Sequence, residues 1–253
     1  MLDKINIQDI IVIAKRAGEA IMQVYNKDFS VEFKGDDSPL TEADKAAHHV
    51  IVAGLEALGD VPILSEEGQH LPYDERKEWD YFWLVDPLDG TKEFVKKNGE
   101  FTVNIALIHQ GAPVLGVVYA PALGQCYWAK QGEGAFKDGQ ALPLKTNLGR
   151  DTYKIVASRS HMSEETQAFV DAIKTDKPKE LVSIGSSLKL CFVAEGAADI
   201  YPRLGPTMEW DTGAAHAIVN EAGFSLQKYS FEHGYEPHPY NKSNLLNDWF
   251  VVS

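Results

Sequence analysis

The sequence is poor in cysteine and in basic residues, and it has no long apolar run. Only two of its 253 residues are cysteines, Cys126 and Cys191, which lie far apart and form no CxxC motif. This excludes a disulfide framework and a cysteine-based zinc site, and we expect two buried thiols in a reducing compartment. The 24 lysines and arginines stand against 37 aspartates and glutamates, a formal net charge of −13. Such an acidic chain is poorly suited to bind a nucleic-acid polymer or an anionic membrane.

The apolar segments are too short to cross a membrane, and the N-terminus has no secretory pattern. The longest aliphatic runs, such as residues 10–14, fall far below the length of a membrane span. Residues 1–9 mix acids and amides with aliphatics and lack a basic segment followed by an apolar one. We therefore expect a cytoplasmic protein with no transmembrane segment and no implied protein partner, while peripheral association with the inner membrane stays open.

The spacing of apolar residues changes along the chain and predicts a layered α/β or α+β fold. Residues 7–25 repeat apolar side chains at helical spacing, and a second helix is predicted from residue 41. Over residues 101–144 the period changes to two, with turn residues between the segments, which predicts an antiparallel meander. The second half alternates strands and helices, among them helices over 186–196 and 211–222.

A shift in composition near residues 145–150 predicts two subdomains that share one core. The first, residues 1–146, is an α+β subdomain with one antiparallel sheet, and it carries most of the acidic residues discussed below. The second, residues 147–253, is an α/β subdomain with a smaller mixed sheet, and it carries Asp211.

The sharpest chemical signal is the segment DPLDGT at residues 86–91, which follows an apolar strand predicted over 81–85. Pro87 fixes its φ angle and Gly90 permits a positive φ, so we expect a tight turn on which two carboxylates converge. Two like charges this close are unfavourable unless a cation offsets them, and hard oxygen ligands suit Mg²⁺. The carbonyl of Leu88 is a further candidate ligand. From this motif alone, a solvated turn rich in Asp and Gly is the alternative.

Acidic residues also stand at the ends of other predicted elements. Glu66 follows a short strand, Asp211 opens a helix and Asp44 lies in the first turn of another helix. Each has an ordinary explanation by itself: an exposed acidic turn for Glu66, an N-cap for Asp211 and a capping-box partner for Asp44. Together with the carboxylates of residues 86–91, they are the groups that metal-assisted hydrolysis of a phosphate ester requires. Glu66 and the hydroxyl of Thr91 would position the attacking water.

Three motifs, in this order and spacing, resemble the signatures of the inositol monophosphatase superfamily: SEE at 65–67, DPLDGT at 86–91 and WDTGAA at 210–215. The resemblance runs over essentially the whole chain. Five further segments resemble the bacterial CysQ-type 3′(2′),5′-bisphosphate nucleotidase branch: GTKEF at 90–94, NGEFTVN at 98–104, SRSH at 158–161, GSSLK at 185–189 and YPR at 201–203. The resemblance implies a layered αβαβα sandwich and a magnesium-dependent, lithium-sensitive phosphatase.

The resemblance also implies a role for each matching residue. It implies two Mg²⁺ ions, with an outer position near a third and weaker ion at Asp44. The implied metal ligands are Glu66, Asp86, the Leu88 carbonyl, Asp89 and Asp211. The implied catalytic residues are Glu66, Thr91 and Asp44. The residues implied to contact the substrate are Glu66, Asp89, Gly90, Thr91, Lys92, His161, Ser186, Ser187, Lys189, Arg203 and Asp211.

The basic residues among these suit a substrate with two phosphates. One phosphate is cleaved, and cations must hold the other without cleaving it. Lys189, Arg203 and His161 have the right chemistry, although each could equally be an ordinary surface residue. Ser186 and Ser187 open a predicted helix and could offer N–H groups to a phosphate.

We therefore expect a Mg²⁺-dependent phosphatase whose substrate is a small nucleotide. The expected reaction converts adenosine 3′,5′-bisphosphate (PAP) to AMP and phosphate in sulfate assimilation, and the sulfated parent nucleotide (PAPS) is an additional candidate substrate. One alternative is an inositol or sugar phosphatase of the same superfamily. The other is a catalytically silent module that binds a nucleotide or Mg²⁺.

Overall fold

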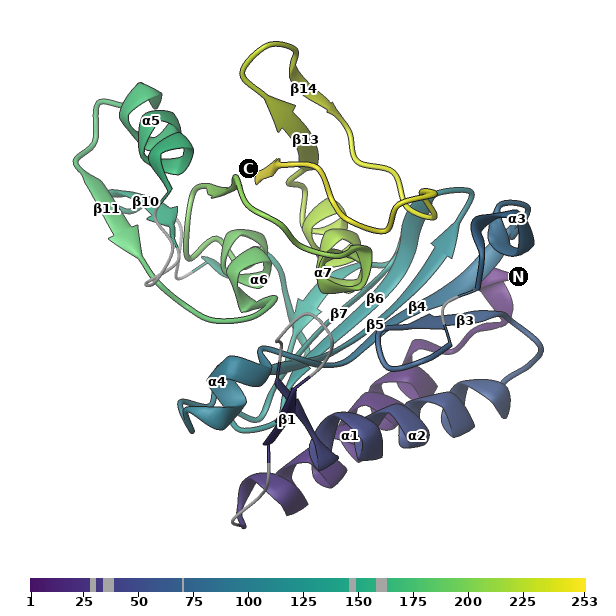
Figure 1. The fold of residues 1–253 in the computed structure, drawn as a ribbon. Coiled ribbons are helices and arrows are strands. Elements are labelled where there is room, and N and C mark those ends of the chain that lie inside the picture. Colours follow the sequence, from purple (N-terminus) through teal and green to yellow (C-terminus); the bar gives the residue numbers. More distant parts are fainter. Residues whose placement is uncertain (28–30, 34–38, 70, 146–148, 158–162) are drawn as a thin grey trace.

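The structure is a computed structural model that describes residues 1–27, 31–33, 39–69, 71–145, 149–157 and 163–253 (Figure 1). A short 3-10 helix (Leu2–Lys4) precedes two long helices, α1 (Ile7–Tyr25) and α2 (Glu42–Glu56). The side chain of Asn6 accepts a hydrogen bond from the Gln8 N–H at 3.1 Å and caps α1, as an N-cap asparagine does. Two short antiparallel strands, β1 (Val31–Phe33) and β2 (Pro39–Thr41), join the two helices.

A seven-stranded sheet forms the centre of the molecule, in the order β3-β4-β5-β6-β7-β8-β9. Its strands are β3 (Ile63–Ser65), β4 (Tyr81–Asp89), β5 (Thr102–His109), β6 (Ala112–Ala120), β7 (Gln125–Lys130), β8 (Gly134–Lys137) and β9 (Gln140–Ala141). The antiparallel meander predicted from the period of two is confirmed. The pair β3–β4 is parallel, which makes the large sheet mixed rather than purely antiparallel. Two short helices, α3 (Tyr73–Arg76) and α4 (Thr91–Val95), flank β4 in sequence.

The second half of the chain supplies three helices and the remaining strands. The helices are α5 (Glu164–Ala172), α6 (Leu188–Ala194) and α7 (Glu209–Glu221). The strands are β10 (Tyr153–Val156), β11 (Lys179–Val182), β12 (Tyr201–Arg203), β13 (Leu226–Ser230), β14 (Gly234–Pro237) and β15 (Phe250–Val252). Strands β12-β15-β13-β14 form an antiparallel sheet, β10 and β11 pair in parallel, and a parallel bridge joins Ile155 to Ile200.

These elements stack in five layers, so the predicted αβαβα sandwich is confirmed (Figure 1). Helices α1 and α2 cover one face of the central sheet through an apolar core that includes Ile10 and Ile51. Helices α6 and α7 cover the other face, and their core continues to Phe250 of the second sheet. Helix α5 packs through Phe169 against the far side of that sheet. The close contact of α7 with the central sheet requires Gly116, because a Cβ there would lie 2.1 Å from the backbone oxygen of Ala214.

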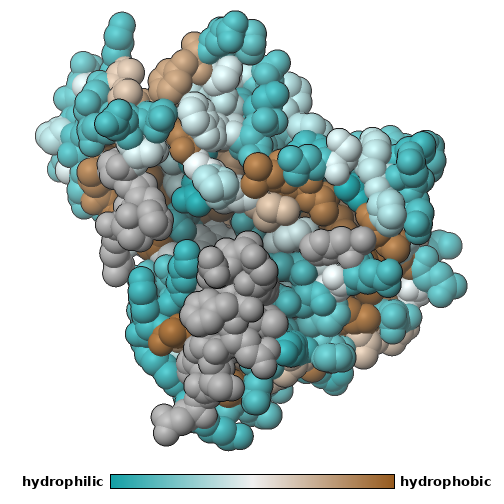
Figure 2. Space-filling view, viewed as in Figure 1, coloured by the Kyte–Doolittle hydropathy of each residue, from teal (hydrophilic) through white to brown (hydrophobic). Residues whose placement is uncertain are grey.

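Hydrophilic side chains cover most of the outer elements on the face seen in Figure 2, and apolar side chains gather in smaller groups between them. None of the helices in the described part of the chain combines the length and apolarity that a membrane crossing needs.

Candidate active site

Strand β4 ends in a bulge that brings two aspartates onto one face of the central sheet. In its pairing with β5, Asp86 lies opposite Asn104 and Asp89 lies opposite Thr102, so three residue steps on β4 match two on β5. Residues three apart on a regular strand face opposite ways, and the extra residue in the bulge returns the second carboxylate to the face of the first. The sequence predicted a tight turn directly after residue 85. Instead β4 continues to residue 89 through Pro87, whose missing N–H suits an unpaired position.

The chain turns at Gly90, whose φ of 90° confirms the positive φ expected there. A Cβ at this position would lie 3.1 Å from the backbone oxygen of Glu100 and 3.2 Å from the Cβ of Ser186. A larger residue would therefore press the end of β4 away from the segment that precedes α6. Helix α4 begins immediately afterwards, at Thr91.

Three carboxylates from two distant parts of the chain meet at this turn. Oxygen atoms of Asp86, Asp89 and Asp211 all lie within 4.8 Å of one another. Asp211 comes from helix α7, where it is the third residue and not the N-cap that the sequence suggested, because the helix begins at Glu209. Its Oδ2 accepts a hydrogen bond from the N–H of Met208 at 2.8 Å. The chemistry of this donor set, three hard oxygens within reach of one point, fits a divalent cation such as Mg²⁺.

The electrostatics of the cluster also fit a bound cation. Burial raises the pKa of Asp86 well above its usual range, and the negative charges of Glu66 and Asp89 raise it further. Burial likewise raises the pKa of Asp211, again with help from Asp89, while the Met208 N–H opposes the shift. Clustered carboxylates repel one another in this way until a positive charge offsets them. The site is therefore unfavourable as a set of bare carboxylates and suited to a metal ion.

The remaining predicted metal and catalytic residues adjoin the cluster. The negative charge of Glu66 helps to raise the pKa of Asp86, which places the Glu66 carboxyl close to the cluster. The N–H of Leu88 donates to Oδ1 of Asp86 at 3.0 Å, and its carbonyl accepts from the Thr91 hydroxyl at 3.3 Å. The same hydroxyl lies 3.4 Å from Oδ1 of Asp44, which is buried at the start of α2. A short chain of polar contacts thus links the carboxylate cluster to the first turn of α2.

Ser186 and Ser187 make contacts that the sequence did not suggest. Oδ2 of Asp89 accepts hydrogen bonds from the hydroxyl of Ser186 at 2.7 Å, and from both the N–H and the hydroxyl of Ser187 at 2.6 Å. The Ser187 hydroxyl also lies 2.8 Å from the backbone oxygen of Asp211. The Ser187 N–H, which was expected to face a phosphate, and both serine hydroxyls are therefore engaged with a carboxylate of the cluster.

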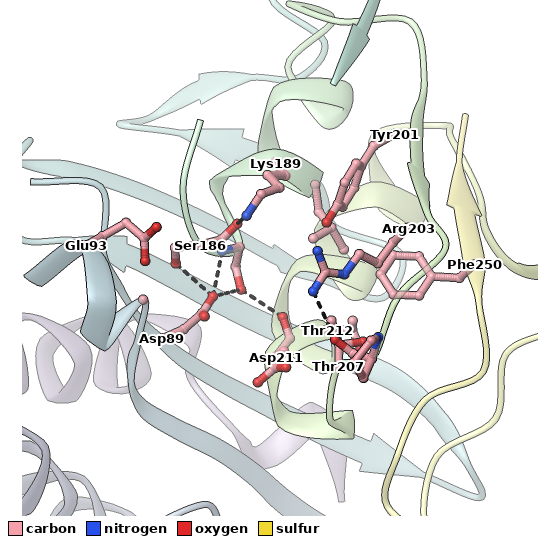
Figure 3. A pocket seen from close by; sticks show the side chains of 14 residues that line it. Asp89, Glu93, Ser186, Lys189, Tyr201, Arg203, Thr207, Asp211, Thr212 and Phe250 are labelled. Carbon is pink, nitrogen blue, oxygen red and sulfur yellow. Dashed lines mark hydrogen bonds between the residues drawn. The ribbon is translucent and has the colours of Figure 1, made fainter. Parts of the chain in front are cut away.

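A cavity opens beside the carboxylates, and basic side chains line it. Lys189 and Arg203 share its lining with Asp89, Gly90 and Asp211 (Figure 3). The positive charge of Arg203 lowers the pKa of Asp211 and so opposes part of the rise caused by burial. The lining of this cavity therefore combines acidic side chains, those of Asp89, Glu93 and Asp211, with the basic side chains of Lys189 and Arg203.

A second cavity adjoins the first and shares Lys189 and Arg203 with it. Lys92 and Lys96 of the α4 region contribute two further basic side chains to its lining. The sequence analysis missed Lys96, although its spacing of four residues from Lys92 was an available signal. His161, also predicted to contact the substrate, lies outside the described residues.

Comparisons with known proteins agree with this geometry. Residues 2–246 match the model of the inositol monophosphatase family. The chain is 50% identical to the 3′(2′),5′-bisphosphate nucleotidase CysQ of Salmonella typhimurium, covering 98% of this chain and 99% of that protein. It is 47% identical to the Escherichia coli protein of the same name, over 95% and 96% of the two chains. The solved structure of CysQ from Bacteroides thetaiotaomicron matches with a TM-score of 0.87 and 45% identity, over 97% and 96% of the two chains. The chain belongs to the inositol monophosphatase family.

Proposed function

We propose that this chain is a Mg²⁺-dependent 3′(2′),5′-bisphosphate nucleotidase that hydrolyses the 3′-phosphate of PAP to AMP and phosphate. The observation that carries the proposal is the meeting of three carboxylates within 4.8 Å, beside cavities lined by basic side chains. The second cavity is lined by Lys92, Lys96, Lys189 and Arg203 and by one acidic residue, Glu93, and this local excess of positive charge in a chain with a net charge of −13 favours an anionic ligand. The relatives that carry the name bisphosphate nucleotidase support the same substrate.

The proposed ligands for two Mg²⁺ ions are the carboxylates of Glu66, Asp86, Asp89 and Asp211 and the carbonyl of Leu88, with Asp44 near a third and weaker position. Oxygen-only donors favour Mg²⁺ over zinc or copper. When bound, the ions would neutralise phosphate oxygens and lower the pKa of a bound water.

We assign the orientation of the attacking water to Thr91, Asp44 and Glu66. The Thr91 hydroxyl has its position set by contacts with Asp44 and with the carbonyl of Leu88. It would place the water beside the carboxylate cluster, and Glu66 would accept the proton that the water loses in the attack. Holding the water and the ester in line removes much of the entropic part of the barrier.

The second phosphate of the substrate would bind to the basic residues of the adjoining cavities. Lys189 and Arg203 line both cavities, and Lys92 and Lys96 line the second one. A monophosphate such as inositol phosphate has no group to place there, so these cations favour a bisphosphate. PAPS carries the same 3′-phosphate and is a second proposed substrate, which would place the enzyme in cytoplasmic sulfate assimilation.

A phosphate-release panel tests the proposal. Purified protein is incubated with PAP, inositol monophosphate or fructose bisphosphate, each with and without Mg²⁺. We expect release from PAP only with Mg²⁺, at the highest kcat/KM of the three. Faster release from inositol monophosphate would favour the inositol phosphatase alternative. Nucleotide binding without any release would make the protein a silent binding module.

A further inference from the structure

Two polar side chains occupy an otherwise apolar face of strand β5. Thr102 and Asn104 are 0% and 1% exposed, and they share their face of the strand with Ala106 and Ile108 of the core beneath α6 and α7. Burying a hydroxyl and an amide there is unfavourable unless both find hydrogen-bond partners. Neither Thr102 nor Asn104 is a proposed metal ligand or a proposed contact of the substrate. Their presence therefore calls for a function other than packing.

The register of the sheet places these two residues opposite the acidic residues of the site. Thr102 is the cross-strand neighbour of Asp89, and Asn104 is the neighbour of Asp86. The Thr102 hydroxyl lies 3.0 Å from the side-chain oxygen of Asn104. Because directly opposed residues of an antiparallel pair share one face, the polar pair lies beside the carboxylates within the same sheet.

The polar pair contacts both serines that hold Asp89. The Thr102 hydroxyl lies 2.6 Å from the hydroxyl of Ser186, and the Asn104 amide donates to the hydroxyl of Ser187 at 2.8 Å. Ser186 has a φ of 56°, a left-handed conformation that non-glycine residues adopt only at a cost of roughly 1 kcal/mol or more. The contacts from β5 therefore hold the serines in an arrangement that the backbone alone does not favour.

Ser186 and Ser187 in turn donate hydrogen bonds to one oxygen of the Asp89 carboxylate and to no other oxygen of that group. Within the part of the chain that the structure describes, Oδ2 of Asp89 accepts three side-chain or N–H hydrogen bonds, and Oδ1 accepts none. A carboxylate fixed through one oxygen presents the second in a defined direction, which is how outer hydrogen bonds tune a metal ligand.

We propose that Thr102 and Asn104 are positioning residues that set the orientation of Asp89 for a divalent cation, acting through Ser186 and Ser187. This inference rests on the metal site of the proposed function, and it adds residues that contact neither the ion nor the substrate. Loss of the Thr102 hydroxyl would free Ser186 from its strained position and let the Asp89 carboxylate rotate. The site would then bind the cation more weakly, although its ligands are unchanged.

Direct binding of Mg²⁺ to the protein without substrate, measured by calorimetry, tests the proposal. Thr102→Val keeps the shape of the side chain and removes the hydroxyl, and we expect the Kd for Mg²⁺ to rise about tenfold. Thr102→Ser restores the hydroxyl and is expected to stay within about twofold of the wild type. Ile105→Val, on the opposite face of the same strand, is the matched control for a loss of core packing. It should lower the melting temperature and leave the Kd unchanged.

Equal Mg²⁺ affinity of the wild type and a folded Thr102→Val protein would overturn the proposal. If Thr102→Val does not fold, Ser186→Ala removes one of the three donors to Asp89 and is expected to weaken Mg²⁺ binding in the same way. Unchanged binding by that variant would also overturn it. Absence of Mg²⁺ binding by the wild type would instead refute the metal site of the proposed function, so the two failures are distinguishable.

Discussion

Replacing Asp89 by asparagine removes a proposed metal ligand while changing the shape of the side chain very little. The Asp89 carboxylate accepts three hydrogen bonds through Oδ2, and an asparagine can keep them by turning its amide oxygen toward the two serines. Its NH₂ group would then face the ion in place of a carboxylate oxygen. The fold should persist, because the change removes negative charge that repels Asp86 and Asp211.

The expected loss of activity follows from the role of the ligand. A metal ion contributes several kcal/mol of transition-state stabilisation, and losing about 4 kcal/mol of it slows hydrolysis roughly 10³-fold. Phosphate release from PAP measures the rate, and thermal melting without Mg²⁺ should give a melting temperature within about 2 °C of the wild type. Asp80→Asn, at the exposed start of the same strand region, is the matched control and should keep full activity. An Asp89→Asn protein that hydrolyses PAP within tenfold of the wild-type rate would refute the reasoning and place the metal site elsewhere.

Three further predictions concern the substrate pocket, a buried histidine and the packing of α7. Replacing both Lys189 and Arg203 by alanine should raise the KM for PAP at least tenfold and leave the KM for 3′-AMP within about twofold. The control Lys228→Ala should change neither KM. An equal rise for both substrates would contradict the proposed binding of the second phosphate by these two residues. Burial lowers the pKa of His238 to about 4, so the folded state excludes a proton that the unfolded chain binds below about pH 6.5. The contribution of His238 to the free energy of unfolding should therefore fall by about 2 kcal/mol between pH 7 and pH 5. In urea unfolding, the wild type should lose about 2 kcal/mol more of its unfolding free energy over this range than His238→Gln does. Equal losses by the two proteins would count against a neutral buried imidazole. Gly116→Ala should lower the free energy of unfolding by about 3 kcal/mol, because a Cβ would overlap the backbone of α7. A decrease below about 0.5 kcal/mol would show that α7 packs less closely against the central sheet than described.

Much of the fold and the list of acidic residues could be predicted from the sequence, because both depend on local patterns. The apolar period of 3.6 gave helix α1 at its observed bounds, and the period of two gave the meander. Asp86 and Asp89 stand out because Pro87 and Gly90 lie beside them. Proline restricts φ and glycine permits a positive φ, so both residues indicate the local backbone conformation. Asp211 by itself is explained as well by helix capping, and only its grouping with the other acidic residues and the family resemblance indicated a metal ligand.

The contacts that complete the site depend on register and could not be predicted. The bulge at the end of β4 changes which residues share a face, and an apolar or polar pattern does not reveal where one strand gains a residue over its neighbour. Thr102 and Asn104 follow the period of a strand whose polar face would ordinarily be solvated, yet both are buried. Ser186 and Ser187 precede a helix and resemble a phosphate-binding turn, and only tertiary packing shows that Asp89 already uses their donors.

The most direct test of the central claim is anomalous diffraction from crystals of the protein grown with Mn²⁺, a heavier ion that substitutes for Mg²⁺ at oxygen sites. We expect at least one strong anomalous peak at about 2.0–2.3 Å from carboxylate oxygens of Asp86, Asp89 and Asp211. Anomalous peaks only at other carboxylates, or none within the cluster at saturating Mn²⁺, would contradict it.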